Sequence, residues 1–434
     1  MYKRNVFLDI LYVIISFSKG DVHMPSKNLI TKLAKLAVNV GANVQKGQIV
    51  VVRATTETKE ITREIVKQAY LAGAKEVFVQ WSDDYVSHSN LTYQSIEALI
   101  DVPNWLVDQY KGFVDEGACF ISVSSPIPGL NKDVDPKKAQ QSGIAIQKAI
   151  HFFREHLMGN KSQWTIIAAP NPVWAKQVFP NLNEDDAVEA LWKAIFNASR
   201  VTEDNDPVAE WDKHNATLLK HNQILNQFNF KHLHFKNSIG TDLIVELVKN
   251  HVWAGGGEHS GSGVYFNPNI PTEETFTMPY KWGTRGKVVA TVPLNYQGKL
   301  VEDFWFVFKD GKVVDYGAKK EKDALTNLLA TDDGSNYIGE IALISYDSPI
   351  SNTKILFLNT LFDENASCHM ALGKAYPMNV KNGVNESLEN LEKIGYNNSM
   401  SHVDFMFGSP DMEIVGTTQD GKEIKVFEKG NFII

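Results

Sequence analysis

Cysteine is nearly absent from this chain, which has only Cys119 and Cys368 among its 434 residues. Two cysteines are too few for a disulfide framework, and also too few for a zinc site built from thiolates. Such scarcity is typical of proteins that stay in the reducing cytoplasm. We therefore expect a cytoplasmic protein in which nitrogen and oxygen atoms, not sulfur, would hold any metal.

The chain also lacks an excess of positive charge. Its 43 lysines and arginines are outnumbered by 51 aspartates and glutamates, which gives a net charge of -8 and a pI near 5.9. A groove for nucleic acid would require the opposite balance. The composition therefore argues against nucleic acid as a partner and favours a neutral or cationic small molecule.

Long hydrophobic runs are missing as well. The apolar run at residues 10–17 follows Lys3 and Arg4 but is too short to span a bilayer. Asp9 interrupts this region and no small-x-small cleavage site follows it, which argues against a secretory signal. We expect residues 1–23 to be an upstream extension or a mis-assigned start, with a weak signal as the alternative. We expect no membrane partner.

Several familiar catalytic signatures are absent. The first strand-to-helix junction, residues 53–56, has no Gly-x-Gly-x-x-Gly, so a dinucleotide site is not expected. The chain contains neither a P-loop nor a His-Glu-x-x-His motif. Residues 261–263 read Gly-Ser-Gly and lack the spacing and context of a serine-hydrolase elbow. These absences exclude the commonest nucleotide and serine-hydrolase sites.

The first half of the chain alternates apolar strands with helices. A chain of 434 residues exceeds one hydrophobic core, so two or three domains are expected. Strands are predicted at 48–53, 76–81, 118–123 and 164–169, and helices at 27–41, 57–72, 135–157, 184–199 and 207–227. Continuous apolar strands between helices indicate a mostly parallel, open sheet covered on both faces. We expect an α/β domain over 24–228, in which the last helix is a connector.

The second half has a different pattern, with short alternating strands. They are predicted at 242–247, 287–292, 304–308, 312–316 and 354–358. Asp-Gly pairs at 310–311 and 420–421 are typical of hairpin turns. The sequence therefore predicts an α+β domain with antiparallel strands over 229–434, and this domain would carry the catalytic residues.

His402 and Asp404 are two residues apart in a stretch that we interpret as a strand. Both side chains would then point to the same face. Imidazole and carboxylate together suit zinc, cobalt or manganese. A histidine–aspartate hydrogen bond inside the core explains the pair equally well, so this pattern alone does not decide.

A second histidine, His369, lies in a segment that we interpret as a helix beginning at Glu364. His369 and Tyr376 would then be two turns apart and share a face. His369 could bind a second metal ion, and Tyr376 could bind a metal or donate to a developing oxyanion. Ordinary packing of both residues is the alternative. Cys368 would face elsewhere and serve packing.

Three glutamates complete the candidate set. Glu340 begins an apolar strand, where it could bridge two metals or act as a general base; a solvated strand end is the alternative. Glu273 and Glu274 lie between Pro271 and Pro279, and in an extended segment they would point to opposite sides. We expect Glu274 to reach the metal and Glu273 to lie in an exposed acidic loop.

Together, these segments resemble the aminopeptidase T / aminopeptidase S family of thermophilic-type metallo-aminopeptidases. The resemblance covers residues 24–434 and is carried by motifs at 240–243, 269–274, 339–342, 363–369 with Tyr376, and 401–404. It implies an exopeptidase that releases N-terminal amino acids from short peptides, with a broad and hydrophobic-leaning preference. It also implies a homodimer that encloses the active sites in an internal cavity.

The resemblance further implies two divalent metal ions, zinc or cobalt, with manganese or magnesium as alternatives. The residues that match the family's metal ligands are Glu274, Glu340, His369, His402 and Asp404, with Tyr376 beside them. Two such ions can activate a water molecule to cut a peptide bond. Tyr376 would bind beside the metals and support the oxyanion.

The donors divide into two groups under this interpretation. Glu274 and His369 would hold one ion. His402 and Asp404 would hold the other, with Glu340 as the bridging ligand and the candidate base. The three carboxylates nearly offset the charge of two dications.

Two other functions use similar ligands. A dimetal phosphoesterase would add a lysine or arginine near the metals, but Lys281, Arg285 and Lys374 do not lie in a phosphate-cradling turn. A non-catalytic metal-binding protein would leave no open coordination position. Neither explains four ordered motifs as well as an aminopeptidase does.

Overall fold

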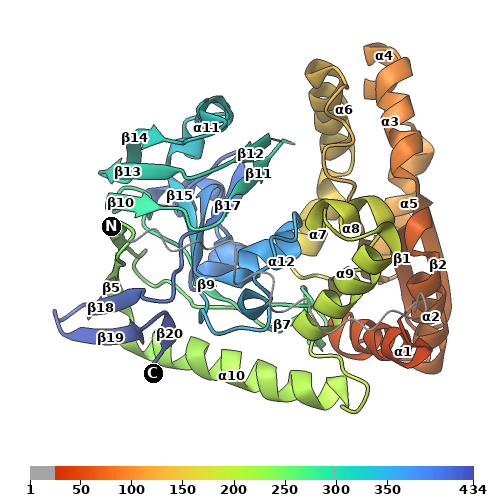
Figure 1. The fold of residues 1–434 in the computed structure, drawn as a ribbon, viewed down its shortest axis with the longest axis horizontal. Coiled ribbons are helices and arrows are strands. Elements are labelled where there is room, and N and C mark those ends of the chain that lie inside the picture. Colours follow the sequence, from red (N-terminus) through yellow and green to blue (C-terminus); the bar gives the residue numbers. More distant parts are fainter. Residues whose placement is uncertain (1–24, 298) are drawn as a thin grey trace.

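The first half of the chain forms a four-stranded parallel sheet with the strand order β2-β1-β3-β4. Figure 1 shows its strands β1 and β2 beside helix α2 (Lys59–Leu71). The computed structural model describes residues 25–297 and 299–434, and the expectations about residues 1–23 lie outside this range. The strands are β1 (Ile49–Thr55), β2 (Glu76–Ser82), β3 (Cys119–Ser124) and β4 (Trp164–Ala168). The predicted α/β architecture is confirmed.

Both faces of this sheet are covered, as its continuous apolar strands predict. Val50 and Val52 of β1 pack with helices α1 (Lys27–Leu36) and α2 (Lys59–Leu71). Ile49 and Val51, which alternate with them, pack with α5 (Asn104–Asp115) and α7 (His151–Met158) on the other face. The first four side chains of the strand, residues 49–52, are thereby buried by one layer or the other.

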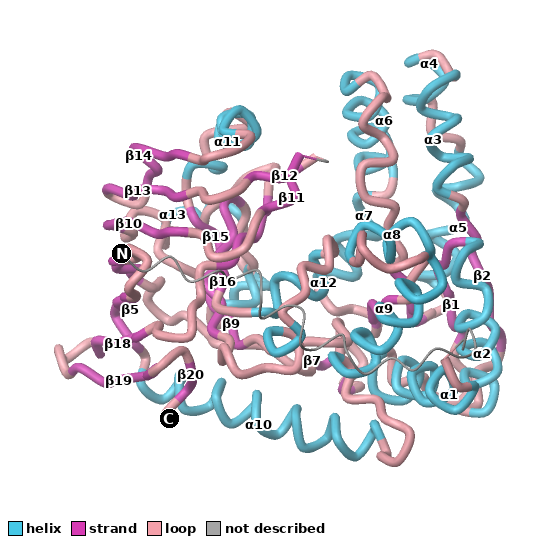
Figure 2. The backbone as a smooth tube through the Cα atoms, viewed as in Figure 1, coloured by secondary structure: helices cyan, strands magenta, loops and turns pink. Residues whose placement is uncertain are grey.

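The remaining helices of the first half frame this sheet. They are α3 (Asp84–Tyr93), α4 (Ile96–Ile100), α6 (Pro136–Ala149), α8 (Pro172–Val178), α9 (Glu184–Ala198) and α10 (Pro207–Phe228). The helix predicted at 135–157 is divided into α6 and α7 at Ile150. α10 runs along the molecule and joins the two halves, and helices concentrate around the parallel sheet while strands dominate the opposite end (Figure 2).

The second half consists of antiparallel sheets, which confirms the predicted α+β class. An eight-stranded sheet has the order β14-β13-β10-β6-β5-β18-β19-β20, and a four-stranded sheet has the order β17-β16-β15-β9. The larger sheet comprises β5 (Phe230–Lys236), β6 (Asp242–Glu246), β10 (Arg285–Val289), β13 (Trp305–Lys309), β14 (Lys312–Gly317), β18 (Glu413–Thr418), β19 (Glu423–Glu428) and β20 (Asn431–Phe432). Both Asp-Gly pairs lie in hairpin turns, between β13 and β14 and between β18 and β19.

The smaller sheet contains β9 (Thr275–Thr277), β15 (Ile338–Leu343), β16 (His369–Gly373) and β17 (His402–Met406). Two further pairs of strands form separate two-stranded sheets, β7 (Glu258–His259) with β8 (Tyr265–Phe266) and β11 (Leu294–Tyr296) with β12 (Lys299–Val301). This half also contains the short helices α11 (Lys322–Leu329), α12 (Thr360–Asp363) and α13 (Leu388–Lys393). The prediction of a strand at 354–358 is wrong. Lys354 and Leu358 have φ angles of 56° and 57°, in the left-handed region that interrupts a strand.

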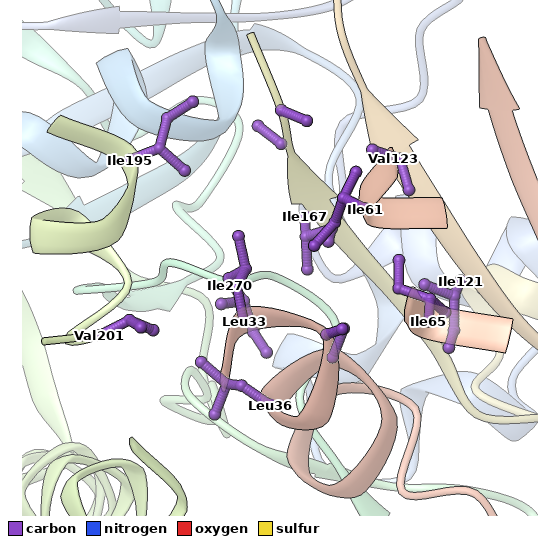
Figure 3. Close-up of a cluster of buried hydrophobic side chains, with 14 of the residues drawn as sticks. Leu33, Leu36, Ile61, Ile65, Ile121, Val123, Ile167, Ile195, Val201 and Ile270 are labelled. Carbon is purple, nitrogen blue, oxygen red and sulfur yellow. The ribbon is translucent and has the colours of Figure 1, made fainter. Parts of the chain in front are cut away.

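The hydrophobic core of the first half includes residues from the second half, which also has a core of its own. Ile270, from the second half, packs among Leu33 and Ile167 of the first half (Figure 3). Phe357 and Phe362, which flank the start of α12, belong to the same cluster. Ile270 lies three and four residues before Glu273 and Glu274, so the segment that carries these glutamates is anchored in the core of the α/β half. No helix in the described ranges is long and apolar enough to cross a membrane.

Candidate metal centre

The register of the four-stranded sheet places the candidate residues on one face. Glu340 of β15 lies opposite Ala371 of β16, and Ala371 lies opposite Asp404 of β17. Residues directly opposite one another in adjacent strands point to the same side, and so do residues two apart in one strand. His369 and His402 therefore share the face of Glu340 and Asp404.

Glu274 joins this face from the edge strand. Ala342 of β15 lies opposite Phe276 of β9, and Ala342 is two residues from Glu340. Glu274 precedes Phe276 by two residues in the same extended segment. The sheet thus brings together five donors that are spread over much of the second half of the chain.

The tightest group is formed by Glu274, Glu340 and His369, which are all buried. His369 Nε2 lies 3.3 Å from Glu274 Oε2 and 3.5 Å from Glu340 Oε1. One ligand atom from each residue lies within 4.8 Å of the others. This geometry fits three ligands of a single divalent cation.

His402 and Asp404 form a second group beside the first. His402 Nε2 lies 3.5 Å from Asp404 Oδ1, 3.7 Å from Glu340 Oε2 and 3.3 Å from the Tyr376 hydroxyl. His402 Nδ1 lies 2.7 Å from the carbonyl oxygen of Lys374. Because a carbonyl only accepts, Nδ1 carries a proton, and Nε2 is the nitrogen that faces the acidic residues.

The carboxylates and histidines perturb one another's pKa values. Burial alone would lower the pKa of His369, but hydrogen bonds to Glu274 and Glu340 outweigh burial and raise it well above its usual value. Burial would also lower the pKa of His402, which its acidic neighbours, Asp404 first, raise to about 10. Burial raises the pKa of Glu340. The cluster therefore concentrates negative charge that calls for cations.

His369 and Tyr376 do not lie on a helix, so that prediction is wrong. Only a short turn, Glu364–Ala366, is helical, and His369 begins the buried strand β16. A short apolar run does not distinguish a strand from a buried helix, and pairing with β15 and β17 decides the outcome. Tyr376 reaches His402 from the loop after β16 instead of from a shared helix face.

Glu273 is buried, so the prediction of an exposed acidic loop is wrong. It points away from Glu274, as the extended segment predicts, but into an ion pair. Arg200 Nη1 and Nη2 both contact its carboxylate, the latter at 2.8 Å, and the backbone N–H of Glu273 donates to Asn365 Oδ1 at 2.8 Å. His214 Nε2 lies 2.7 Å from the carbonyl oxygen of Thr272. These contacts hold the backbone that carries Glu274.

Glu364 is a member of the cluster that sequence reasoning missed. Its pKa is raised well above the usual value, first by burial and then by the nearby charges of Asp404 and Glu274. It lies in the motif at 363–369, so its proximity to His369 in sequence was a usable signal. Interpretation of this segment as a helix start concealed it.

The donor set fits divalent metal ions. Four carboxylates, those of Glu274, Glu340, Glu364 and Asp404, converge here, and within the described ranges none of them pairs with a lysine or arginine. Buried carboxylates without cationic partners are strongly unfavourable. Carboxylate and imidazole are ligands that zinc, cobalt and manganese accept. These residues could therefore hold metal, and Tyr376 stands beside them.

Comparisons with known proteins find similar proteins over most of the chain. A family model described as "Thermophilic metalloprotease (M29)" matches residues 26–432. Aminopeptidase AmpS of Bacillus subtilis (strain 168) is 46% identical over 399 residues, covering 92% of this chain and 97% of that protein. "Aminopeptidase 2" of Geobacillus stearothermophilus is 44% identical with the same coverage. The structure of wild-type AmpT from Thermus thermophilus matches with a TM-score of 0.88 at 37% identity, covering 94% of this chain and 100% of that one.

Proposed function

The chain belongs to the thermophilic metalloprotease family M29 and is a metallo-aminopeptidase, and on that premise we propose that two divalent metal ions serve its active site. The family expected from the sequence is thereby confirmed. The observation that carries the two-metal proposal is the position of Glu340. One of its oxygens faces His369 and the other faces His402, at 3.5 and 3.7 Å. A carboxylate that faces two histidines in this way is suited to bridge two ions.

Charge balance supports the same number of ions. Four carboxylates bring four negative charges into the cluster, and two divalent cations bring four positive charges. A single dication would leave two carboxylates uncompensated in a largely buried space, which is strongly unfavourable. We assign Glu274, His369 and Glu364 to one ion, and His402 and Asp404 to the other, with Glu340 between them.

The side chains around the ions would share the remaining tasks. Bound divalent ions would supply Lewis acidity and activate water. Glu340 would accept the proton that the attacking water loses, since its carboxylate lies between the two histidines. The Tyr376 hydroxyl, 3.3 Å from His402 Nε2, would donate a hydrogen bond to the carbonyl oxygen of the scissile bond as negative charge develops there.

The electrostatics of the cluster favour a substrate with a free amino terminus. An α-ammonium group is attracted by the carboxylates that remain accessible beside the ions. This attraction accounts for cleavage at the first residue of a peptide. We propose short peptides with a broad, hydrophobic-leaning first residue as substrates, and zinc or cobalt as the metals.

We also propose that the protein acts as a cytoplasmic homodimer. Two helical projections, one formed by α3 and α4 and the other by α6, stand out from the body (Figure 1). Tyr93 in α3 and Trp105 in α5 are 85% and 69% exposed, which is unusual for large aromatic side chains. Apolar residues on projecting helices support contact with a second copy. Both cysteines are free and buried, which agrees with a reducing compartment.

Hydrolysis of leucine p-nitroanilide tests the proposed function. Treatment with a chelator is expected to lower the rate by at least about 100-fold, since metal-derived stabilisation amounts to several kcal/mol. Zinc, cobalt or manganese should then restore it. The same substrate with an acetylated amino group should not react. Activity that resists complete removal of metal would contradict the proposal.

A phosphoesterase is the rival that the same assay can exclude. Metal-loaded protein should hydrolyse p-nitrophenyl phosphate no faster than protein stripped of metal. If the metal-loaded protein released p-nitrophenol from the phosphate ester but no p-nitroaniline from leucine p-nitroanilide, the protein would be a phosphoesterase instead.

Replacement of Glu364 tests its place in the metal centre. Glu364→Gln is expected to weaken metal binding by about 10–100-fold, a range typical of groups that support a metal site. Competition with a chromophoric chelator measures this affinity directly. Glu389→Gln on α13 is the matched control, because the Glu389 side chain is 79% exposed and lies outside the cluster. Equal affinities in both variants would remove Glu364 from the site.

A further inference from the structure

The α/β half contains an open cavity that the metal centre does not use. Its volume is about 740 Å³, and its walls include Arg53 of β1, Trp81 of β2 and Ser122 of β3. These residues lie toward the carboxyl ends of parallel strands. The chain passes from β1 to β2 on one side and then to β3 on the other side of β1. Ligands of open α/β sheets commonly bind at such a switch point.

Arg53 is a partly buried cation without an acidic partner among the described residues. Its Nε and Nη2 groups donate to the hydroxyl of Ser122 at 3.1 and 2.8 Å, and its guanidinium lies 5.7 Å from the ring centroid of Phe153. No aspartate or glutamate of the described ranges forms an ion pair with it, and burial lowers its pKa. The Nη1 group of Arg53 makes no hydrogen bond to any residue in the described ranges. A charge that is partly removed from water and has no acidic partner is unfavourable unless a ligand compensates it.

Arg200, which is also partly buried, has the carboxylate partner that Arg53 lacks. Arg200 is held by the two oxygens of Glu273, in the planar two-pronged arrangement that guanidinium prefers. Arg53 contacts a single hydroxyl through two of its nitrogens, and it lines an open cavity. The protein therefore provides the cation of an anion-binding site, and the anion would be a bound ligand.

The cavity wall limits the charge of that anion. Arg53 is the only charged residue among the fourteen that line the cavity, and the others are hydroxyl, amide, aromatic or aliphatic residues. One cation matches a monoanion. The junction after β1, residues 55–58, has no glycine and forms only a short 3-10 turn, so no nest of backbone N–H groups is available for phosphate. These features favour a carboxylate.

The wall also specifies an apolar part of the ligand. Trp81 lines the cavity and is 46% exposed, and Tyr110 lines it from α5. Aromatic surfaces of this kind pack against flat or branched apolar groups. We propose that this cavity binds a small organic carboxylate, with its carboxylate on Arg53 and its apolar part against Trp81. The carboxyl terminus of a short peptide and a free apolar acid share this chemistry.

Calorimetric titration of the metal-loaded, full-length protein tests the site. N-acetyl-phenylalanine and its amide are suitable probes, because a blocked amino group prevents aminopeptidase cleavage. The acid is expected to bind at least about tenfold more tightly than the amide, a ratio that corresponds to about 1.4 kcal/mol. Binding should persist after chelation, which separates this cavity from the metal centre.

Two variants assign the binding to the cavity. Arg53→Gln should weaken binding of the acid by at least about tenfold, while Arg63→Gln, an exposed arginine on α2, should leave it unchanged. Trp81→Ala should also weaken binding, and because Trp81 is exposed this variant should fold even where Arg53→Gln does not. Equal affinity for acid and amide, unchanged affinity in both Arg53→Gln and Trp81→Ala, or loss of binding on chelation would each overturn the proposal.

A longer probe distinguishes the two sources of carboxylate. N-acetyl-Gly-Gly-phenylalanine carries the same terminal group on a peptide. Tighter binding than that of N-acetyl-phenylalanine would identify the peptide carboxyl terminus as the ligand, and weaker binding would identify a free acid. Neither result depends on catalysis, so failure of hydrolysis and failure of this site can be told apart.

Discussion

Glu340→Gln is expected to lower the turnover of leucine p-nitroanilide by about 10²- to 10⁴-fold, the range attributed to a lost general base. Glutamine has nearly the same shape as glutamate, so the buried site in β15 should keep its packing. The amide cannot accept the proton from water, and it carries no charge to offset the metals. The fall should therefore appear in kcat at saturating metal.

The measurement needs two companions. Glu413→Gln, at an exposed position of β18, is the matched control and should retain full activity. Metal content measured on the same Glu340→Gln preparation separates loss of the base from loss of an ion. Undiminished turnover by a folded, pure Glu340→Gln protein would remove Glu340 from the chemistry.

Arg200→Leu is expected to reduce the free energy of unfolding by about 3–5 kcal/mol, the typical result of removing one partner of a buried ion pair. The Arg200 and Glu273 side chains are only 19% and 8% exposed, so leucine would leave a buried carboxylate without a cation. Denaturant-induced unfolding measures the change. The same variant should bind metal more weakly, because Glu273 adjoins Glu274.

A matched control and a double variant sharpen this test. Arg285 pairs with Glu246 at 2.9 Å, but these side chains are 50% and 30% exposed. Arg285→Leu should therefore change stability by about 0–1 kcal/mol only. Arg200→Leu combined with Glu273→Gln should recover part of the loss, since the unpaired charge is gone. Equal effects of the two single arginine variants would show that burial of the Arg200 pair is unimportant.

Local patterns in the sequence were sufficient for the fold class and for part of the site. Continuous apolar strands and alternating strands differ in which faces they bury, and that difference separated the parallel sheet from the antiparallel sheets. His402 and Asp404 share a face because of the strand period alone. Both results follow from the order of residues along one strand, and the structure agrees with them. The division of the chain at 228 and 229 stays a prediction, because the core of the first half includes residues from the second half.

Nonlocal contacts explain what could not be predicted. His369 lies in a strand because β15 and β17 pair with it on both sides, and no residue near it in sequence records that pairing. Glu273 is buried because Arg200 approaches from the α/β half. Glu364 lies near His369 in sequence, but its place beside Asp404 and Glu274 depends on the fold.

The position of Ile270 in the core of the first half has a consequence for the history of the chain. The second half is not an exchangeable module, because the segment that carries Glu274 is anchored by side chains of the first half that a foreign domain would not provide. Recombination between distant relatives at residues 228–229 would separate Ile270 from Leu33, and Glu273 from Arg200. A substitution on one side of this boundary therefore requires a compatible residue on the other. The two halves are expected to evolve together.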